Sequence, residues 1–209
     1  TMDKKFLDNI ITNNNQLKGI ILVLAIMIFF IAYGNLGGVD LRAYFIITIL
    51  RDICSLIGIY YLYVFVRFEL KQKISLFIFV IYLLTIAYFL FMNTYLLVLS
   101  YVRDAEIVSI YKKEVYQYIP IFFVYASIIG ISIQLLLNTC SGKIGKALKL
   151  IGVFFIIESI SLFVSLNLLY GDFYSIYSFF LTIIYILPYM AMIYLYALVL
   201  NQPIVEEKI

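Results

Sequence analysis

The apolar stretch at residues 44–66 constrains the chain most, because it is long enough to cross a membrane and still carries two charges. A helix needs about 20 predominantly apolar residues to cross ~30 Å of hydrocarbon. Arg51 and Asp52 divide this stretch into two pieces that are each too short to span alone. Each charge costs at least ~2.5–3.5 kcal/mol at the centre of a membrane helix, so we expect the pair to face a helix-bundle interior and to mark a functional site by default.

The composition is that of a membrane protein. Hydrophobic residues make up 65% of the 209 residues and charged residues 13%, whereas soluble domains have roughly 45–50% and 25%. Histidine is absent, which removes the commonest metal ligand and general base. Cys54 and Cys140 form no metal-binding pattern and are expected to be small buried hydrophobes. We expect no enzymatic activity, no cofactor and no nucleic-acid partner.

Apolar segments separated by polar or glycine-rich turns predict an all-α integral membrane protein with six transmembrane helices. The spans of this transmembrane domain (residues 19–200) are expected at residues 19–36, 44–66, 74–102, 119–140, 150–170 and 177–200. Residues 1–18 and 201–209 flank them as short ends. Residues 141–150 are expected to form a basic loop, Pro120 to lie in the first turn of the fourth span, and Pro188 to kink the sixth.

The distribution of lysine and arginine predicts the orientation, because cytoplasmic loops carry an excess of these residues. Six spans place both termini on one side, which collects ten of them: Lys4, Lys5, Lys18, Arg67, Lys71, Lys73, Lys143, Lys146, Lys149 and Lys208. The other side collects four: Arg42, Arg103, Lys112 and Lys113. Both termini are therefore expected in the cytoplasm, and the protein in a plasma membrane of the bacterial inner-membrane type.

Spans two and five share a short pattern. Asp52 and Glu158 are each followed after two residues by Ser-Leu and a further apolar residue. Three spans per half run in opposite directions, and inverted repeats with a midplane site are a recurring transporter plan. Apolar segments of this composition also match by chance, so a 3+3 inverted repeat and a chance match are both open.

Arg51, Asp52 and Glu158 are the leading candidates for chemistry. They could bind an ion or polar solute or relay a proton, and they could equally form a structural ion pair that fixes helix packing. Adjacent helical residues point about 100° apart, so we expect Arg51 to pair with Glu158 rather than with Asp52. A wet vestibule around the first turns of span two, where charges cost little, is a third interpretation.

Polar side chains at helical spacing predict a cavity between spans two, four, five and six, with Asp52 and Glu158 on its wall. For any single serine, ordinary hydrogen bonding between membrane helices is the simpler interpretation. The candidate ligand-binding residues are Arg51, Asp52, Ser55, Gln134, Asn138, Glu158, Ser161, Ser165, Tyr185 and Tyr189.

The leading hypothesis is a small polytopic membrane protein that binds or transports a small solute or ion at a midplane polar site between spans two and five. The alternative is a membrane sensor, regulatory or assembly subunit that acts through a partner protein. The expected partners are the lipid bilayer, the solute or ion, and either further copies of the chain or a partner membrane subunit.

Overall fold

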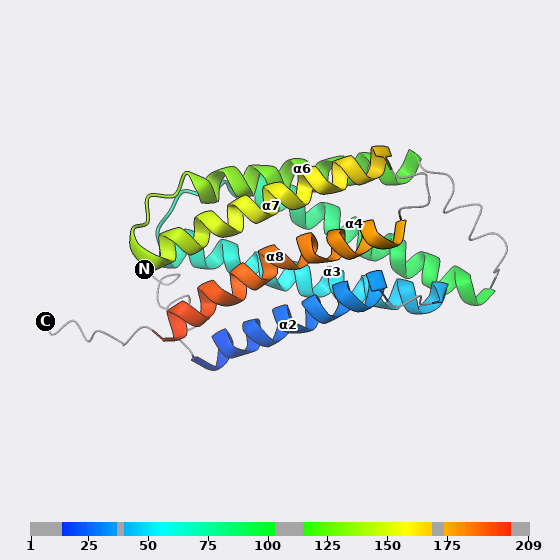
Figure 1. Ribbon diagram of the computed structural model, residues 1–209, viewed down its shortest axis with the longest axis horizontal. Helices are drawn as coiled ribbons and strands as arrows, with labels where there is room; N and C mark the ends of the chain where they lie inside the picture. Colours follow the sequence, from blue (N-terminus) through cyan, green and yellow to red (C-terminus); the bar gives the residue numbers. More distant parts are fainter. Residues whose placement is uncertain (1–13, 37–39, 103–114, 169–173, 202–209) are drawn as a thin grey trace, which may run out of the picture.

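The computed structural model describes residues 14–36, 40–102, 115–168 and 174–201 (Figure 1). These residues form helices and turns and contain no strand. The helices are α2 (Asn14–Leu36), α3 (Leu41–Val64), α4 (Leu76–Val102), α6 (Val115–Leu136), α7 (Gly142–Leu168) and α8 (Tyr174–Leu200), and the π-helical turn η1 (Phe65–Glu69) extends α3.

Four of these helices contain segments long and apolar enough to cross a membrane. The segments are Asn15–Gly34, Arg42–Glu69, Leu76–Tyr101 and Phe179–Leu200, and a shorter apolar helix covers Pro120–Leu136. Large apolar side chains such as Phe77, Phe91 and Leu137 are exposed on the outside of the bundle. Such an apolar exterior suits contact with lipid, so the chain has the character of an all-helical integral membrane protein.

The six helices form a closed ring in which neighbours alternate in direction (Figure 1). Each helix packs against the next one along the described chain, and α8 packs back against α2. The start of α2 and the end of α8 lie at the same end of the bundle, together with the turns that join α3 to α4 and α6 to α7 (Figure 1). We call the half of the bundle at this end the terminal half, and the other half the distal half.

The terminal half is tightly packed. Leu24, Leu62, Leu135, Leu148 and Met192 come from five different helices, and each is at most 1% exposed. Side chains of this kind gain many van der Waals contacts on packing, which is the main attraction between helices in lipid. This packed layer closes the bundle on the side of the chain ends.

The expected basic loop at residues 141–150 is mostly helical, because α7 already begins at Gly142. Lys143, Lys146 and Lys149 are exposed, whereas Leu148 between them is fully buried. A spacing of three residues keeps the lysines near one face of a helix. The segment is therefore an amphipathic first part of α7 rather than a loop.

An N-terminal cap and two prolines can be compared with the predicted helix boundaries. The Asp40 carboxylate accepts a hydrogen bond of 2.7 Å from the Ala43 backbone N–H, which caps α3 and explains why it begins three residues before the predicted span. Pro120 lies in the second turn of α6 and not in the first, since α6 begins at Val115. Pro188 lies inside α8, and the expected kink there stays a prediction.

Replacing Gly152 by alanine is expected to lower the melting temperature of the detergent-purified protein. A methyl carbon at this position would lie 2.9 Å from the Ser132 carbonyl oxygen and 3.2 Å from the Leu136 side chain, so it would push α7 away from α6. Gly19→Ala is the matched control, because a methyl group there meets nothing within 4 Å. Alanine is more favourable than glycine inside a helix by about 1 kcal/mol, so a Gly152→Ala protein as stable as Gly19→Ala would contradict this packing.

Candidate functional site

A cavity of about 430 Å³ lies at the middle of the bundle and in its distal half, and all six described helices contribute to its wall. Small-molecule sites in proteins usually measure about 300–1,000 Å³. The polar and charged residues of the wall are Tyr44, Thr48, Arg51, Asp52, Ser55, Tyr82, Tyr88, Asn93, Tyr125, Glu158, Tyr185 and Tyr189. The cavity is therefore large enough for a metabolite-sized molecule and has polar groups to orient it.

Helix α3 supplies the most polar part of this wall. Thr48, Asp52 and Ser55 are spaced four and three residues apart, which puts them on one face of the helix, and all three are buried. The Thr48 hydroxyl donates to the Tyr44 carbonyl oxygen at 2.9 Å. Asp52 lies at the middle of α3, whereas Tyr82 lies in the first third of α4, nearer the terminal end, so the cavity spans the middle of the bundle and extends into the distal half.

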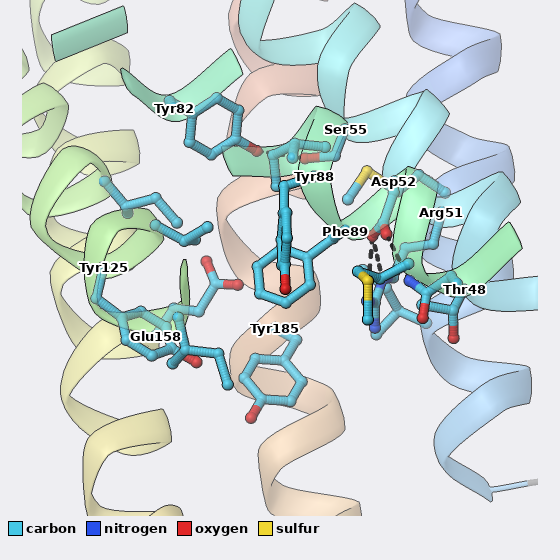
Figure 2. A pocket seen from close by; sticks show the side chains of 18 of the residues that line it. Thr48, Arg51, Asp52, Ser55, Tyr82, Tyr88, Phe89, Tyr125, Glu158 and Tyr185 are labelled. Carbon is cyan, nitrogen blue, oxygen red and sulfur yellow. Dashed lines mark hydrogen bonds and ion pairs between the residues drawn. The ribbon is translucent and has the colours of Figure 1, made fainter. Parts of the chain in front are cut away.

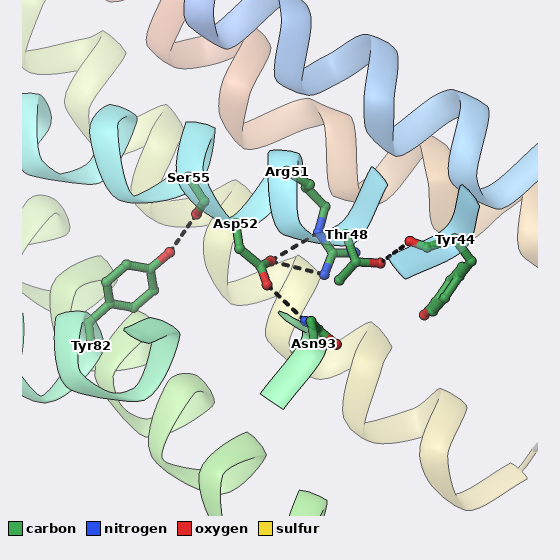
Figure 3. A network of polar contacts seen from close by, with 7 residues as sticks. All are labelled: Tyr44, Thr48, Arg51, Asp52, Ser55, Tyr82 and Asn93. Carbon is green, nitrogen blue, oxygen red and sulfur yellow. Dashed lines mark hydrogen bonds and ion pairs between the residues drawn. The ribbon is translucent and has the colours of Figure 1, made fainter. Parts of the chain in front are cut away.

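Arg51 and Asp52 form an ion pair with each other (Figure 3). The Arg51 Nη2 and Nε atoms donate to Asp52 Oδ1 at 3.2 and 3.4 Å. The expected pairing of Arg51 with Glu158 is thus wrong. The two Cβ atoms do point apart on the helix, but the arginine side chain is long enough to fold back over its neighbour's carboxylate.

Helix α4 provides further hydrogen-bond partners for the polar face of α3. The Asn93 side-chain amide donates to the second oxygen of Asp52, Oδ2, at 3.3 Å. The Ser55 and Tyr82 hydroxyl oxygens lie 2.6 Å apart and share a hydrogen bond (Figure 3). Both oxygens of the Asp52 carboxylate therefore have partners, and its charge is balanced by Arg51.

Glu158 on α7 differs from Asp52 because its carboxylate has no such partner. The residue is 8% exposed, and its Oε2 atom is buried without a hydrogen bond. In Figure 2 its carboxyl group points into the cavity, from the side opposite Arg51 and Asp52. A carboxylate removed from water is costly unless it is paired, hydrated or protonated. Glu158 therefore gives the cavity one acidic group that the described protein does not satisfy.

The structure brings six of the predicted site residues together at the cavity: Arg51, Asp52, Ser55, Glu158, Tyr185 and Tyr189. Ser161 does not line it, and the side chain of Ser165 lies outside the described part of the structure.

Gln134 and Asn138 are found at the terminal end of the bundle, away from the cavity, contrary to their prediction as wall residues. The Gln134 Oε1 atom accepts a hydrogen bond of 2.7 Å from the Ser75 backbone N–H. Asn138 bonds to the Leu135 carbonyl oxygen and accepts from the Cys140 N–H at 3.1 Å. Since α6 ends at Leu136, these amides hold the connecting turns in place.

Sequence reasoning missed the contribution of α2 and α4 to the wall, and on α6 it selected residues other than those that line the cavity. Asn93 had a usable signal, because a side-chain amide inside a long apolar span needs a polar partner. The aromatic wall residues had little signal. Tyr82, Tyr88 and Tyr125 belong to a chain with 20 tyrosines, and spacing alone does not separate inward-facing rings from those at the membrane interface.

Comparison with known proteins gives no further identification: no family model, no curated protein and no solved structure matches the chain.

Proposed function

We propose that this protein is a small polytopic membrane protein that binds a small organic solute in the cavity of the distal half, between α3 and α7, and that it serves solute uptake or transport. The single observation that carries the proposal is the Glu158 carboxylate, which is buried, faces the cavity and has a buried oxygen without a hydrogen bond. Intramembrane ionisable groups of this kind mark ligand or ion pathways by default.

The size and wall of the cavity favour an organic solute over a bare ion. A single water needs only about 10–15 Å³ of such space, whereas this cavity measures about 430 Å³. The described residues contain no cluster of three or more histidine, cysteine or acidic side chains that would hold a metal ion. A solute with several polar atoms and an apolar body fits a wall that combines charges, hydroxyls and rings.

The proposed orientation places both termini in the cytoplasm, with six spans across a plasma membrane of the bacterial inner type. The ten-to-four bias of lysine and arginine supports it. In this orientation the packed terminal half faces the cytoplasm and the cavity belongs to the outer half of the membrane. A solute would then enter from outside, and transport would require the terminal half to open.

A 3+3 inverted repeat also stays a prediction. In its favour, the two matched acids Asp52 and Glu158 line the same cavity. The next matched pair is less symmetric, since Ser55 lines the cavity whereas Ser161 does not.

The sensor or assembly-subunit hypothesis uses the same cavity with a different output. One observation favours it over a channel: the terminal half is filled by side chains that are almost fully buried. A protein that only senses a solute needs no path through this layer. A partner protein, or further copies of the chain, would then read the bound state.

Solute binding in the cavity can be tested by filling the cavity with a larger side chain. Met92 on α4 lines the cavity, whereas its neighbour Phe91 is 69% exposed on the outside. We expect that, in a panel of small cationic, anionic, zwitterionic and neutral solutes, at least one raises the melting temperature of the wild type and of Phe91→Trp, but not that of Met92→Trp. A ligand at 100 times its Kd stabilises the bound protein by about 2.7 kcal/mol.

Two outcomes would contradict the proposal. Either no solute of the panel shifts the melting temperature of the wild type, or every stabilising solute acts equally well on the protein whose cavity is filled. Size-exclusion chromatography of each variant provides the check that it is folded.

A further inference from the structure

The charges of the cavity wall do not cancel. Arg51 and Asp52 are held together at 3.2 Å, and Asn93 occupies the second oxygen of Asp52. This pair is formally neutral as a unit. The remaining charged residue of the described wall is Glu158, whose Oε2 atom is buried without a hydrogen bond. With Glu158 ionised, the wall therefore carries one net negative charge.

Aromatic side chains make up much of the rest of the wall. They come from α3, α4, α6 and α8 and are Tyr44, Tyr82, Tyr88, Phe89, Tyr125, Tyr185 and Tyr189. Figure 2 shows Tyr88, Phe89 and Tyr185 in the region between Glu158 on one side and Arg51 with Asp52 on the other. The faces of such rings attract cations through their quadrupoles, and the attraction is larger where water is excluded.

An inorganic cation would use this wall poorly. Such an ion needs several oxygen ligands to replace its hydration shell, and Glu158 is the one acid of the described wall that is not already engaged by Arg51. An alkylammonium ion has a weaker hydration shell, and its methyl or methylene groups match the rings. One carboxylate together with aromatic faces is the arrangement that recognises quaternary ammonium groups in other proteins.

We propose that the ligand of this cavity is an organic cation with a substituted ammonium group, held by the Glu158 carboxylate and the surrounding aromatic rings. This inference rests on the proposed function, because it names the class of solute for the same site. The Arg51–Asp52 pair then orients the polar end of the ligand, through guanidinium and carboxylate atoms that also line the cavity.

Choline and its neutral isostere dimethylbutanol, in which carbon replaces the charged nitrogen, are the probes for this inference. Binding is measured by thermal shift and by isothermal titration calorimetry on the full chain in detergent. We expect choline to bind the wild type and Glu158→Asp, and to bind Glu158→Gln at least about tenfold more weakly, because the charge is lost from a site of low dielectric. Dimethylbutanol should bind all three proteins weakly and to the same extent.

The inference is overturned if choline binds Glu158→Gln as tightly as the wild type, or if dimethylbutanol binds the wild type as tightly as choline. If choline fails while an anionic or neutral solute stabilises the wild type, the cation inference falls and the proposed function stands. If no solute binds the wild type, both fall. Glu158→Asp keeps the test decisive should glutamine at this position disturb the fold, because it retains the charge and shortens the side chain.

Discussion

Replacing Glu158 by leucine is expected to stabilise the ligand-free protein by about 1–3 kcal/mol, although it removes a buried side chain from the centre of the bundle. The reason is that Glu158 is 8% exposed and its Oε2 atom has no hydrogen bond. Removing an unsatisfied buried polar group relieves its desolvation cost, and leucine is of similar size. The same substitution should abolish solute binding. The measurements are the unfolding midpoint in detergent and a thermal-shift titration.

If Glu158→Leu raises the stability of the protein and also abolishes solute binding, then Glu158 has a functional role and not a structural one. Asp52→Leu is the matched control, since Asp52 is also buried but is bonded to Arg51 and Asn93. It should destabilise the protein, because it leaves those partners without their acceptor. If Glu158→Leu destabilises the protein as much as Asp52→Leu does, then Glu158 holds the fold together and the cavity loses its binding group.

Replacing Arg51 by leucine is expected to destabilise the protein by about 1–3 kcal/mol, between the values for exposed and for fully buried ion pairs. The Asp52 side chain is only 7% exposed, so without Arg51 it becomes a buried carboxylate with Asn93 as its remaining partner. The Arg51 side chain keeps 40% of its surface accessible, and this lowers the expected loss below that of a fully buried pair. Unfolding midpoints are the measurement.

The double variants identify the partner of Arg51. Arg51→Leu with Asp52→Leu should recover much of the stability lost in Arg51→Leu, because both charges of the pair are then removed. Arg51→Leu with Glu158→Leu should show weaker coupling than this, because the Arg51 charge acts on Glu158 across the cavity without an ion pair between the two side chains. Strong coupling of Arg51 to Glu158 and weak coupling to Asp52 would show that the ion pair described above is not the one that stabilises the protein.

The helical architecture could be predicted from the sequence because hydrocarbon leaves few alternatives for a chain with so many apolar residues. The same physics identified residues 51, 52 and 158 as interior positions, because charges inside apolar segments have nowhere else to go. Helix starts were predicted less well. A search for apolar spans assigns the lysine-bearing segment before residue 150 to a loop. The lysines are three residues apart, however, which is the spacing of an exposed helical face.

Pairing inside the cavity could not be predicted from the direction of Cβ atoms alone. Arg51 meets its sequence neighbour because a flexible side chain samples positions that its backbone vector does not indicate. The positions of Gln134 and Asn138 depend on where α6 ends. Because α6 ends at Leu136 and not at residue 140, Gln134 lies in its last turn and Asn138 in the turn that follows, away from the cavity wall. The aromatic residues of the wall could not be predicted without knowing which helices are neighbours in the closed bundle.

Labelling of cysteines placed in the two halves of the bundle tests directly whether a water-accessible cavity opens to the outside of the cell. Met92→Cys puts a thiol on the cavity wall, and Met192→Cys puts one into the terminal half, where Met192 is fully buried. Both are made in a chain whose Cys54 and Cys140 are replaced by alanine. A membrane-impermeant maleimide is added outside right-side-out vesicles, and the modified fraction is read by mass shift.

We expect the cysteine at position 92 to react from outside in the folded protein, and the one at position 192 to react only after denaturation. Reaction at position 92 only when the vesicles are opened would contradict the orientation. If neither cysteine reacts until the protein is denatured, the distal half holds no water-accessible cavity, and the proposed solute site is wrong.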